Sequence, residues 1–244
     1  MLHLRGMEIR DGFIVGVHNY CDAWCDRCTL TSHCRVFADM CELEAADDPN
    51  LKPVVDAPRH PDDEPEPTPS WLQELLDEIN IESERAPKAD SARRPPRVVP
   101  EGEAIEQRAD AYLRRTRAWL QRSDSEPHSS PGEPLAVISW FHMVIHVKAM
   151  RALHGLAEDD RSWRDWPADH DGSAKVALIG IDQSHRAWRD LVEVGRVPPA
   201  EAAPFLHDLV WLRSALERTF PKARGFVRPG FDEPAEVARL LQST

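Results

Sequence analysis

All five cysteines of this 244-residue chain lie between positions 21 and 41, in a stretch that begins HNYCDAWCDRCTLTSHC. Cys21, Cys25, Cys28 and Cys34 have the spacing C-x3-C-x2-C-x5-C, and Cys41 follows. Thiolates bind zinc and iron–sulfur clusters, and clustered thiols in a reducing compartment are more often metal ligands than disulfides. The pattern therefore predicts a metal centre held by the first four cysteines, with Cys41 as a spare.

The spacing also bears on which metal is bound. If residues 20–29 form a helix, the first three cysteines occupy positions i, i+4 and i+7 on one face, and the fourth returns at the start of the next helix. Cβ atoms four residues apart on a helix are separated by about 5–6 Å, whereas tetrahedral zinc with Zn–S bonds of about 2.3 Å needs sulfurs roughly 3.8 Å apart. A cubane cluster binds each thiolate through a different iron and tolerates wider separations. We therefore expect a 4Fe-4S iron–sulfur cluster slightly ahead of structural zinc, with His18 and His33 as substitute ligands.

Two parts of this stretch resemble cysteine motifs of known families. Cys25, Cys28 and Cys34, spaced C-x2-C-x5-C, resemble the iron–sulfur staple of certain CRISPR-associated and recombination-repair exonucleases. Cys21, Cys25 and Cys28, spaced C-x3-C-x2-C, are similar to the radical-SAM signature. The exonucleases take their fourth cysteine from far upstream and need an acidic and lysine nuclease core, and the radical-SAM family needs a βα barrel. Since the sequence predicts neither, we carry no activity over from these families.

Four residues in the C-terminal half could bind a second metal. His142 and His146 are spaced i, i+4, but the Glu of the zinc-protease motif H-E-x-x-H is missing. Asp182 and His185, spaced i, i+3, resemble half of the carboxylate–histidine pattern of di-iron bundles. An alternative hypothesis is therefore a helical-bundle metalloenzyme that uses these four residues. The simpler interpretation is that they are core or surface residues bonded to their neighbours.

Cations beside apolar helical stretches need partners, because an unpaired buried charge is costly. Lys148 and Arg151 follow the longest apolar run, and Lys175 lies on one row with Asp182. The simpler interpretation is that they form interhelical ion pairs with nearby aspartates such as Asp171. The functional alternative is a polar pocket for a small anionic ligand, lined by Lys148, Arg151, Lys175, Asp182 and His185.

The composition changes after the cysteines. Residues 46–69 include DDPNLKPVVDAPRHPDDEPEPTP, which is dense in Pro and acidic residues and poor in large apolar groups. Such a segment buries too little surface to offset its ordering entropy, so we expect residues 46–70 to form an extended linker or loop. A third hypothesis is an interaction protein that binds a protein partner through residues 46–69. Residues 71–100 are predicted to form a short helix over 71–81 and a Pro-rich connection.

The remaining sequence predicts helices. Residues 102–122, 134–156, 172–194 and 200–219 carry apolar residues at helical spacing, and a short helix is expected after Asp232. The segment 134–156 is apolar nearly all round in its first half, so it should be central in the core. The predicted fold is mainly α, a helical bundle over residues 101–244 with a cysteine-rich metal-binding hairpin over residues 1–45.

Charge and hydropathy exclude several classes of function. The net charge is −12 and the pI about 5.4, so nucleic-acid binding is not expected. The N-terminus has no long apolar region, so we expect no signal peptide. The longest apolar run, residues 135–147, is too short to span a bilayer. We therefore expect a cytoplasmic protein without membrane contact. Neither a catalysed reaction nor an oligomeric state is indicated.

Overall fold

The computed structural model describes residues 2–4, 7–45, 99, 101–122, 133–158, 169–233 and 235. The chain divides into two compact units, residues 1–42 with 96–244, and residues 43–95. The predictions for residues 46–70 and for almost all of residues 71–100 lie outside the described residues, as does most of the predicted C-terminal helix. In the described part of the chain, no helix is both long and apolar enough to cross a membrane.

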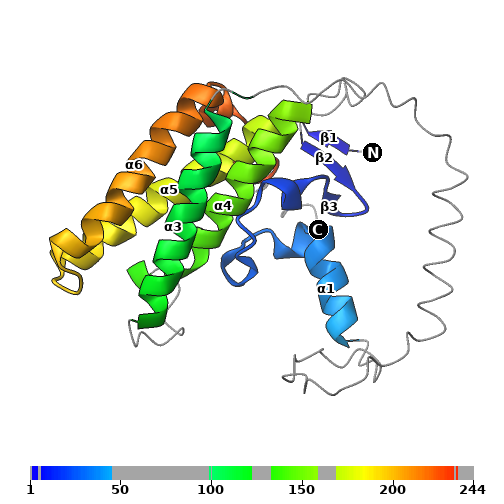
Figure 1. Ribbon diagram of the computed structural model, residues 1–244. Helices are drawn as coiled ribbons and strands as arrows, with labels where there is room; N and C mark the ends of the chain where they lie inside the picture. Colours follow the sequence, from blue (N-terminus) through cyan, green and yellow to red (C-terminus); the bar gives the residue numbers. More distant parts are fainter. Residues whose placement is uncertain are drawn as a thin grey trace, which may run out of the picture. The chain divides into compact units, whose positions relative to one another are not determined.

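Four long helices form the bundle of the first unit: α3 (Gly102–Arg122), α4 (Pro134–Glu158), α5 (Asp169–Glu193) and α6 (Pro199–Thr219). Each packs against two of the others, so that α3, α4, α5 and α6 follow one another around the core (Figure 1). The mainly helical fold is thereby confirmed, with helix ends within a few residues of the predicted ones. Pro199 stands in the first turn of α6, where no backbone N–H needs an intrahelical partner.

Aromatic side chains fill the bundle core. Trp188 of α5 is fully buried and stacks on Phe205 of α6, with ring centroids 4.1 Å apart, and Trp119 of α3 meets the same indole edge-on at 4.8 Å. The expectation that α4 is central to the core is only partly met, because Met143 and Val147 are 57% and 54% exposed. One face of α4 is therefore open, although its opposite face is buried.

The N-terminal region begins with a small antiparallel sheet that the sequence analysis did not predict. Strands β1 (Leu2–Leu4), β2 (Met7–Arg10) and β3 (Phe13–Ile14) pair in the order β1-β2-β3. The turn between β2 and β3 is Asp11–Gly12, with φ angles of 52° and 82°. Positive φ at both central residues is typical of a type I′ hairpin turn, for which Asp-Gly is a favoured pair.

Three short 3₁₀ helices follow the sheet: η1 (Val17–Tyr20), η2 (Cys25–Arg27) and η3 (Thr31–His33), before helix α1 (Arg35–Ala45). The single helix considered for residues 20–29 does not form, and η1 and η2 stand in its place. The physical reason lies at Asp22, whose Oδ1 accepts the backbone N–H of Trp24 at 3.1 Å. This local bond offers the backbone an alternative to the helix, and Ala23 between them has a φ of 58°.

The cysteine segment, which we define as residues 8–42, packs on the bundle. The indole of Trp24 stacks on Trp140 of α4 at 5.1 Å, and Trp140 Nε1 donates a hydrogen bond of 2.8 Å to the carbonyl of Asp22. Gly172 of α5 faces Tyr20, and a Cβ added there would lie 2.3 Å from a ring carbon of Tyr20. The absent side chain at this glycine is what lets Tyr20 approach α5 so closely.

Candidate metal centre

All four predicted ligands line one cavity of about 30 Å³. Cys21 follows η1, Cys25 opens η2, Cys28 follows η2, and Cys34 follows η3 directly before α1. The remaining lining residues are Val17, His18, Asp22, Ala23, Trp24, Leu30, Thr31, Phe37 and Phe231. The four cysteines, which lie within fourteen consecutive positions of the sequence, thus line the same cavity.

The cysteines do not lie on one face of an α-helix but at the ends of three 3₁₀ helices. Cys21, Cys28 and Cys34 each occupy the residue that follows such a helix, and all three are extended. The N–H of Cys28 bonds to the carbonyl of Cys25, and the N–H of Cys34 bonds to that of Thr31. The segment therefore presents its cysteines at successive tight turns, not along one helix. The prediction that Cys34 stands at the start of the next helix is met by α1.

The thiols influence one another electrostatically. Burial raises the pKa of Cys25 and Cys28, and the neighbouring thiols Cys21 and Cys34 raise both further. The N–H of Leu30 donates to Cys28 Sγ at 3.4 Å, and this bond alone acts in the opposite direction, lowering the pKa of Cys28. Four thiolates in one place repel each other, so their joint ionisation needs a compensating cation, and metal binding would release protons.

The sulfurs share a cavity without converging on one point. Among the described residues, no group of three or more His, Cys, Asp or Glu side chains has the geometry to hold a metal ion. Of the substitute ligands, His18 lines the cavity, whereas His33 is buried elsewhere with its Nδ1 2.9 Å from the carbonyl of Gly12. Cys41 is exposed on α1.

A residue from the far end of the chain completes the cavity wall. Phe231 lines the cavity, and the next residue, Asp232, accepts a hydrogen bond of 2.6 Å from Lys175 of α5 and one of 3.0 Å from Arg228. Gly230 has a φ of 78°, and a Cβ there would lie 2.9 Å from Leu30. The role of Phe231 could not be predicted from the sequence, because nothing local connects it to cysteines nearly two hundred residues earlier. Its only signal is a large aromatic residue in a loop rich in Gly, Pro and Arg.

The five residues of the predicted polar pocket are not brought together. Lys148 of α4 donates to the carbonyl of Asn19 at 2.7 Å, and Arg151 lies 3.4 Å from the Asn19 side chain. Lys175 instead contacts the carbonyl of Phe226 and the carboxylate of Asp232. Asp182 and His185 lie farther along α5, in a separate groove. Lys148, Arg151 and Lys175 therefore contact partners in the N- and C-terminal segments.

Two residues of the alternative metal site, Asp182 and His142, have other partners. Asp182 forms ion pairs with Arg213 at 2.8 Å and Arg224 at 2.6 Å. His142 Nδ1 lies 2.7 Å from the carbonyl of Ser139, and burial lowers its pKa. The Nδ1 atom of His146 is buried and has no hydrogen-bond partner among the described residues.

Fold and site together define a helical-bundle protein that carries a cavity lined by four cysteines. Neither protein-family models nor curated proteins nor solved structures give a significant match to the chain. The function is therefore argued from the site itself.

Proposed function

We propose that this protein binds one metal centre through Cys21, Cys25, Cys28 and Cys34. The observation that carries the proposal is the single cavity that all four thiols line. All five cysteines are free, which is consistent with a reducing compartment such as the cytoplasm. The donor set fits the metals that prefer thiolate, namely zinc and the iron of iron–sulfur clusters.

An iron–sulfur cluster is the preferred occupant. A zinc ion bound by four thiolates draws their sulfurs to roughly 3.8 Å from one another and leaves no open space between them. The four cysteines line one cavity, but no three of the described side chains converge to hold a single ion. A cluster, whose irons each bind a different thiolate, tolerates such wider separations. Zinc is the alternative, because the cysteines stand at irregular turns and are not held at the spacing of one helix face, which is too wide for zinc.

Either centre would stabilise the cysteine segment. The ligands stand at successive turns, so a shared metal would connect η1, η2 and η3 at one point. The centre would thereby hold together the surface that contacts α4 through Trp24 and Trp140. An iron–sulfur cluster would add the capacity for one-electron transfer or for sensing oxidants, whereas four-thiolate zinc, with no open position, would be structural only.

The test is anaerobic purification followed by an ultraviolet–visible spectrum and by iron, sulfide and zinc analysis of the same sample. We expect a brown protein with about four irons and matching sulfide per chain; a colourless protein with about one zinc per chain would assign the site to zinc. The variant Cys25→Ser/Cys28→Ser should lose the metal. The matched control is Cys41→Ser, since Cys41 is exposed and outside the cavity, and it should keep the metal.

Two outcomes contradict the proposal. A wild-type protein that holds neither iron nor zinc after anaerobic purification, and takes up neither when reconstituted, has no such centre. Metal that is fully retained by Cys25→Ser/Cys28→Ser is bound elsewhere, and the search would move to the histidines of α4 and α5.

A further inference from the structure

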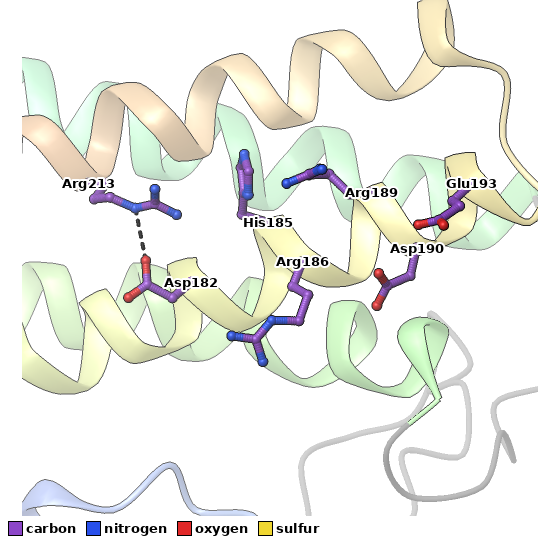
Figure 2. Close-up of a pocket in the computed structure, with 7 residues that line it drawn as sticks. All are labelled: Asp182, His185, Arg186, Arg189, Asp190, Glu193 and Arg213. Carbon is purple, nitrogen blue, oxygen red and sulfur yellow. Dashed lines mark ion pairs between the residues drawn. The ribbon is translucent and has the colours of Figure 1, made fainter.

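A second hollow lies between α5 and α6, and every side chain that lines it is ionisable. Its volume is about 380 Å³, which falls within the range of small-molecule sites. Figure 2 shows that Arg213 reaches into it from α6, whereas the other labelled residues come from α5. We call this hollow the arginine groove. It lies on the bundle and shares no lining residue with the cysteine cavity.

Three nitrogen-bearing side chains meet at the centre of the groove. In Figure 2, His185 stands between Arg213 and Arg189, whose guanidinium groups both point toward it. Burial and then the charges of Arg213 and Arg189 lower the pKa of His185, whereas the charge of Asp182 acts in the opposite direction. Such a gathering of donors is unfavourable by itself and becomes favourable when an anion is bound among them.

The carboxylate of Asp182 is already engaged by other arginines. It pairs with Arg213 at 2.8 Å and with Arg224 at 2.6 Å, and Arg224 also pairs with Glu217 at 2.9 Å. Arg189 makes no hydrogen bond or ion pair with any residue that the structure describes. An exposed arginine without a partner beside a half-buried histidine leaves donors available to a ligand.

The other end of the groove has the opposite character. Asp190 and Glu193 line it near the C-terminal end of α5. In Figure 2 the guanidinium of Arg189 is turned away from both carboxylates. Carboxylates accept hydrogen bonds from hydroxyl and ammonium groups. The groove thus offers donors at one end and acceptors at the other.

We propose that the arginine groove binds a small phosphorylated molecule, with its phosphoryl group among His185, Arg189 and Arg213 and its hydroxyl or amino groups toward Asp190 and Glu193. Guanidinium groups match the geometry of phosphate oxygens and bind them in pairs. A phosphate monoester presents three such oxygens, and three donor side chains converge here. A sugar phosphate would satisfy both ends, whereas inorganic phosphate would satisfy only one.

The test is isothermal titration calorimetry of the full-length, metal-loaded protein at low ionic strength, with ribose 5-phosphate and inorganic phosphate as the two probes. We expect both to bind, ribose 5-phosphate the more tightly. Arg189→Gln should weaken the binding of both by about fivefold or more, because a charge-assisted hydrogen bond is lost. Arg189 is exposed, so the variant should fold, and a circular dichroism spectrum checks this.

The matched control is Arg117→Gln, which removes the same charge from an exposed position on α3, outside the groove. This variant should bind within about twofold of the wild type. Equal losses in the two variants would mean that phosphate responds only to net charge, and would overturn the proposal. Failure of the wild type to bind either probe at millimolar concentration would overturn it as well. Equal affinity for the two probes would refute the assignment of Asp190 and Glu193.

Discussion

The bundle and the cysteine segment differ in what they bury. In the bundle, whole aromatic side chains such as Trp188, Tyr112 and Phe141 are completely inaccessible to solvent. The separate core of the cysteine segment consists of Ile9, Ile14, Val17 and Leu30. A core of four aliphatic side chains is too small to stabilise so many ordered residues alone. The bundle can therefore rely on burial, whereas the cysteine segment depends on docking and on the proposed metal centre.

Contacts with the bundle stabilise the cysteine segment. Trp24 packs into the main core, against Trp140 and Phe141 of α4. Lys148 of α4 donates a hydrogen bond to the carbonyl of Asn19, which is the second-last residue of η1. The two regions are therefore expected to respond differently to substitutions: core deletions should affect the bundle, and changes at the contact should affect the segment.

The largest effect on stability is expected for Trp188→Ala. This change removes a fully buried indole that stacks on Phe205 and donates a 3.3 Å hydrogen bond to the Tyr112 hydroxyl. It should lower the free energy of unfolding by about 3–5 kcal/mol, measured by urea unfolding followed by circular dichroism. Metal content of the folded protein should not change, because Trp188 lies outside the cysteine cavity.

A matched control for that prediction is Trp211→Ala. Trp211 is only half-buried, with the Arg108 guanidinium 5.0 Å from its ring. Its removal should lower the free energy of unfolding by roughly 1–2 kcal/mol, since less apolar surface is lost from the core. If the two variants were destabilised equally, the bundle core would not be organised around Trp188.

The helices could be predicted from the sequence because their signal is local. Apolar residues recur at helical spacing within each one, and the predicted segment 102–122 matches α3 in full. The spacing of the cysteines also allowed a helix over residues 20–29. That helix does not form, because the side chain of Asp22 accepts the N–H of Trp24. The hairpin of β2 and β3 was not predicted, although Asp11–Gly12 marks its turn.

The candidate site was predictable only in part, because some of its residues are close in the sequence and others are brought together by tertiary contacts. The four cysteines stand close together in the sequence, and their clustering was enough to select the residues that line the cavity. Phe231 and the Lys175–Asp232 pair, 57 residues apart in the chain, depend on tertiary contacts. The same limit explains why the predicted polar pocket combined residues from three different places.

An intermediate effect is expected for Gly172→Ala, which tests the contact between the two regions. The added Cβ would lie 2.3 Å from a ring carbon of Tyr20 and 2.9 Å from one of Phe226. Such overpacking typically lowers the free energy of unfolding by about 1–3 kcal/mol. We expect amide hydrogen exchange to speed up in residues 17–28, with little change in the core of the bundle, because the strain falls on the docked segment.

Gly155→Ala is the matched control for this contact. Its Cβ would lie 3.4 Å from the Cβ of His170, an ordinary contact distance, and the better helix propensity of alanine should stabilise α4 by up to about 1 kcal/mol. If both variants left the exchange of residues 17–28 unchanged, Tyr20 would not be held against α5 in solution.

The smallest effect concerns Asp232, which links the C-terminal segment to α5 beside the cysteine cavity. Burial by itself would raise the pKa of this carboxyl, but hydrogen bonds from Arg228 and Lys175 outweigh burial and hold the pKa far below its usual value of 3.8. A carboxyl whose pKa is lowered by folding contributes stability above the unfolded pKa and loses it as the pH falls. Asp232→Asn should therefore lower the free energy of unfolding by about 1 kcal/mol at neutral pH, and the difference from the wild type should shrink as the pH falls below 3.8.

Urea unfolding of both proteins at several pH values measures this difference, and acid effects common to the two proteins, such as release of the proposed metal, cancel in it. Asp39→Asn is the control, because Asp39 has one exposed partner, Arg35, at 2.7 Å; an exposed pair on a helix contributes only about 0.3–0.5 kcal/mol. If the difference for Asp232→Asn were independent of pH, the carboxylate would not be held by Lys175 and Arg228. The ion pairs of Asp232 would then not hold Phe231 in the cavity wall. Its position would depend only on the contacts of its ring with the cysteine segment.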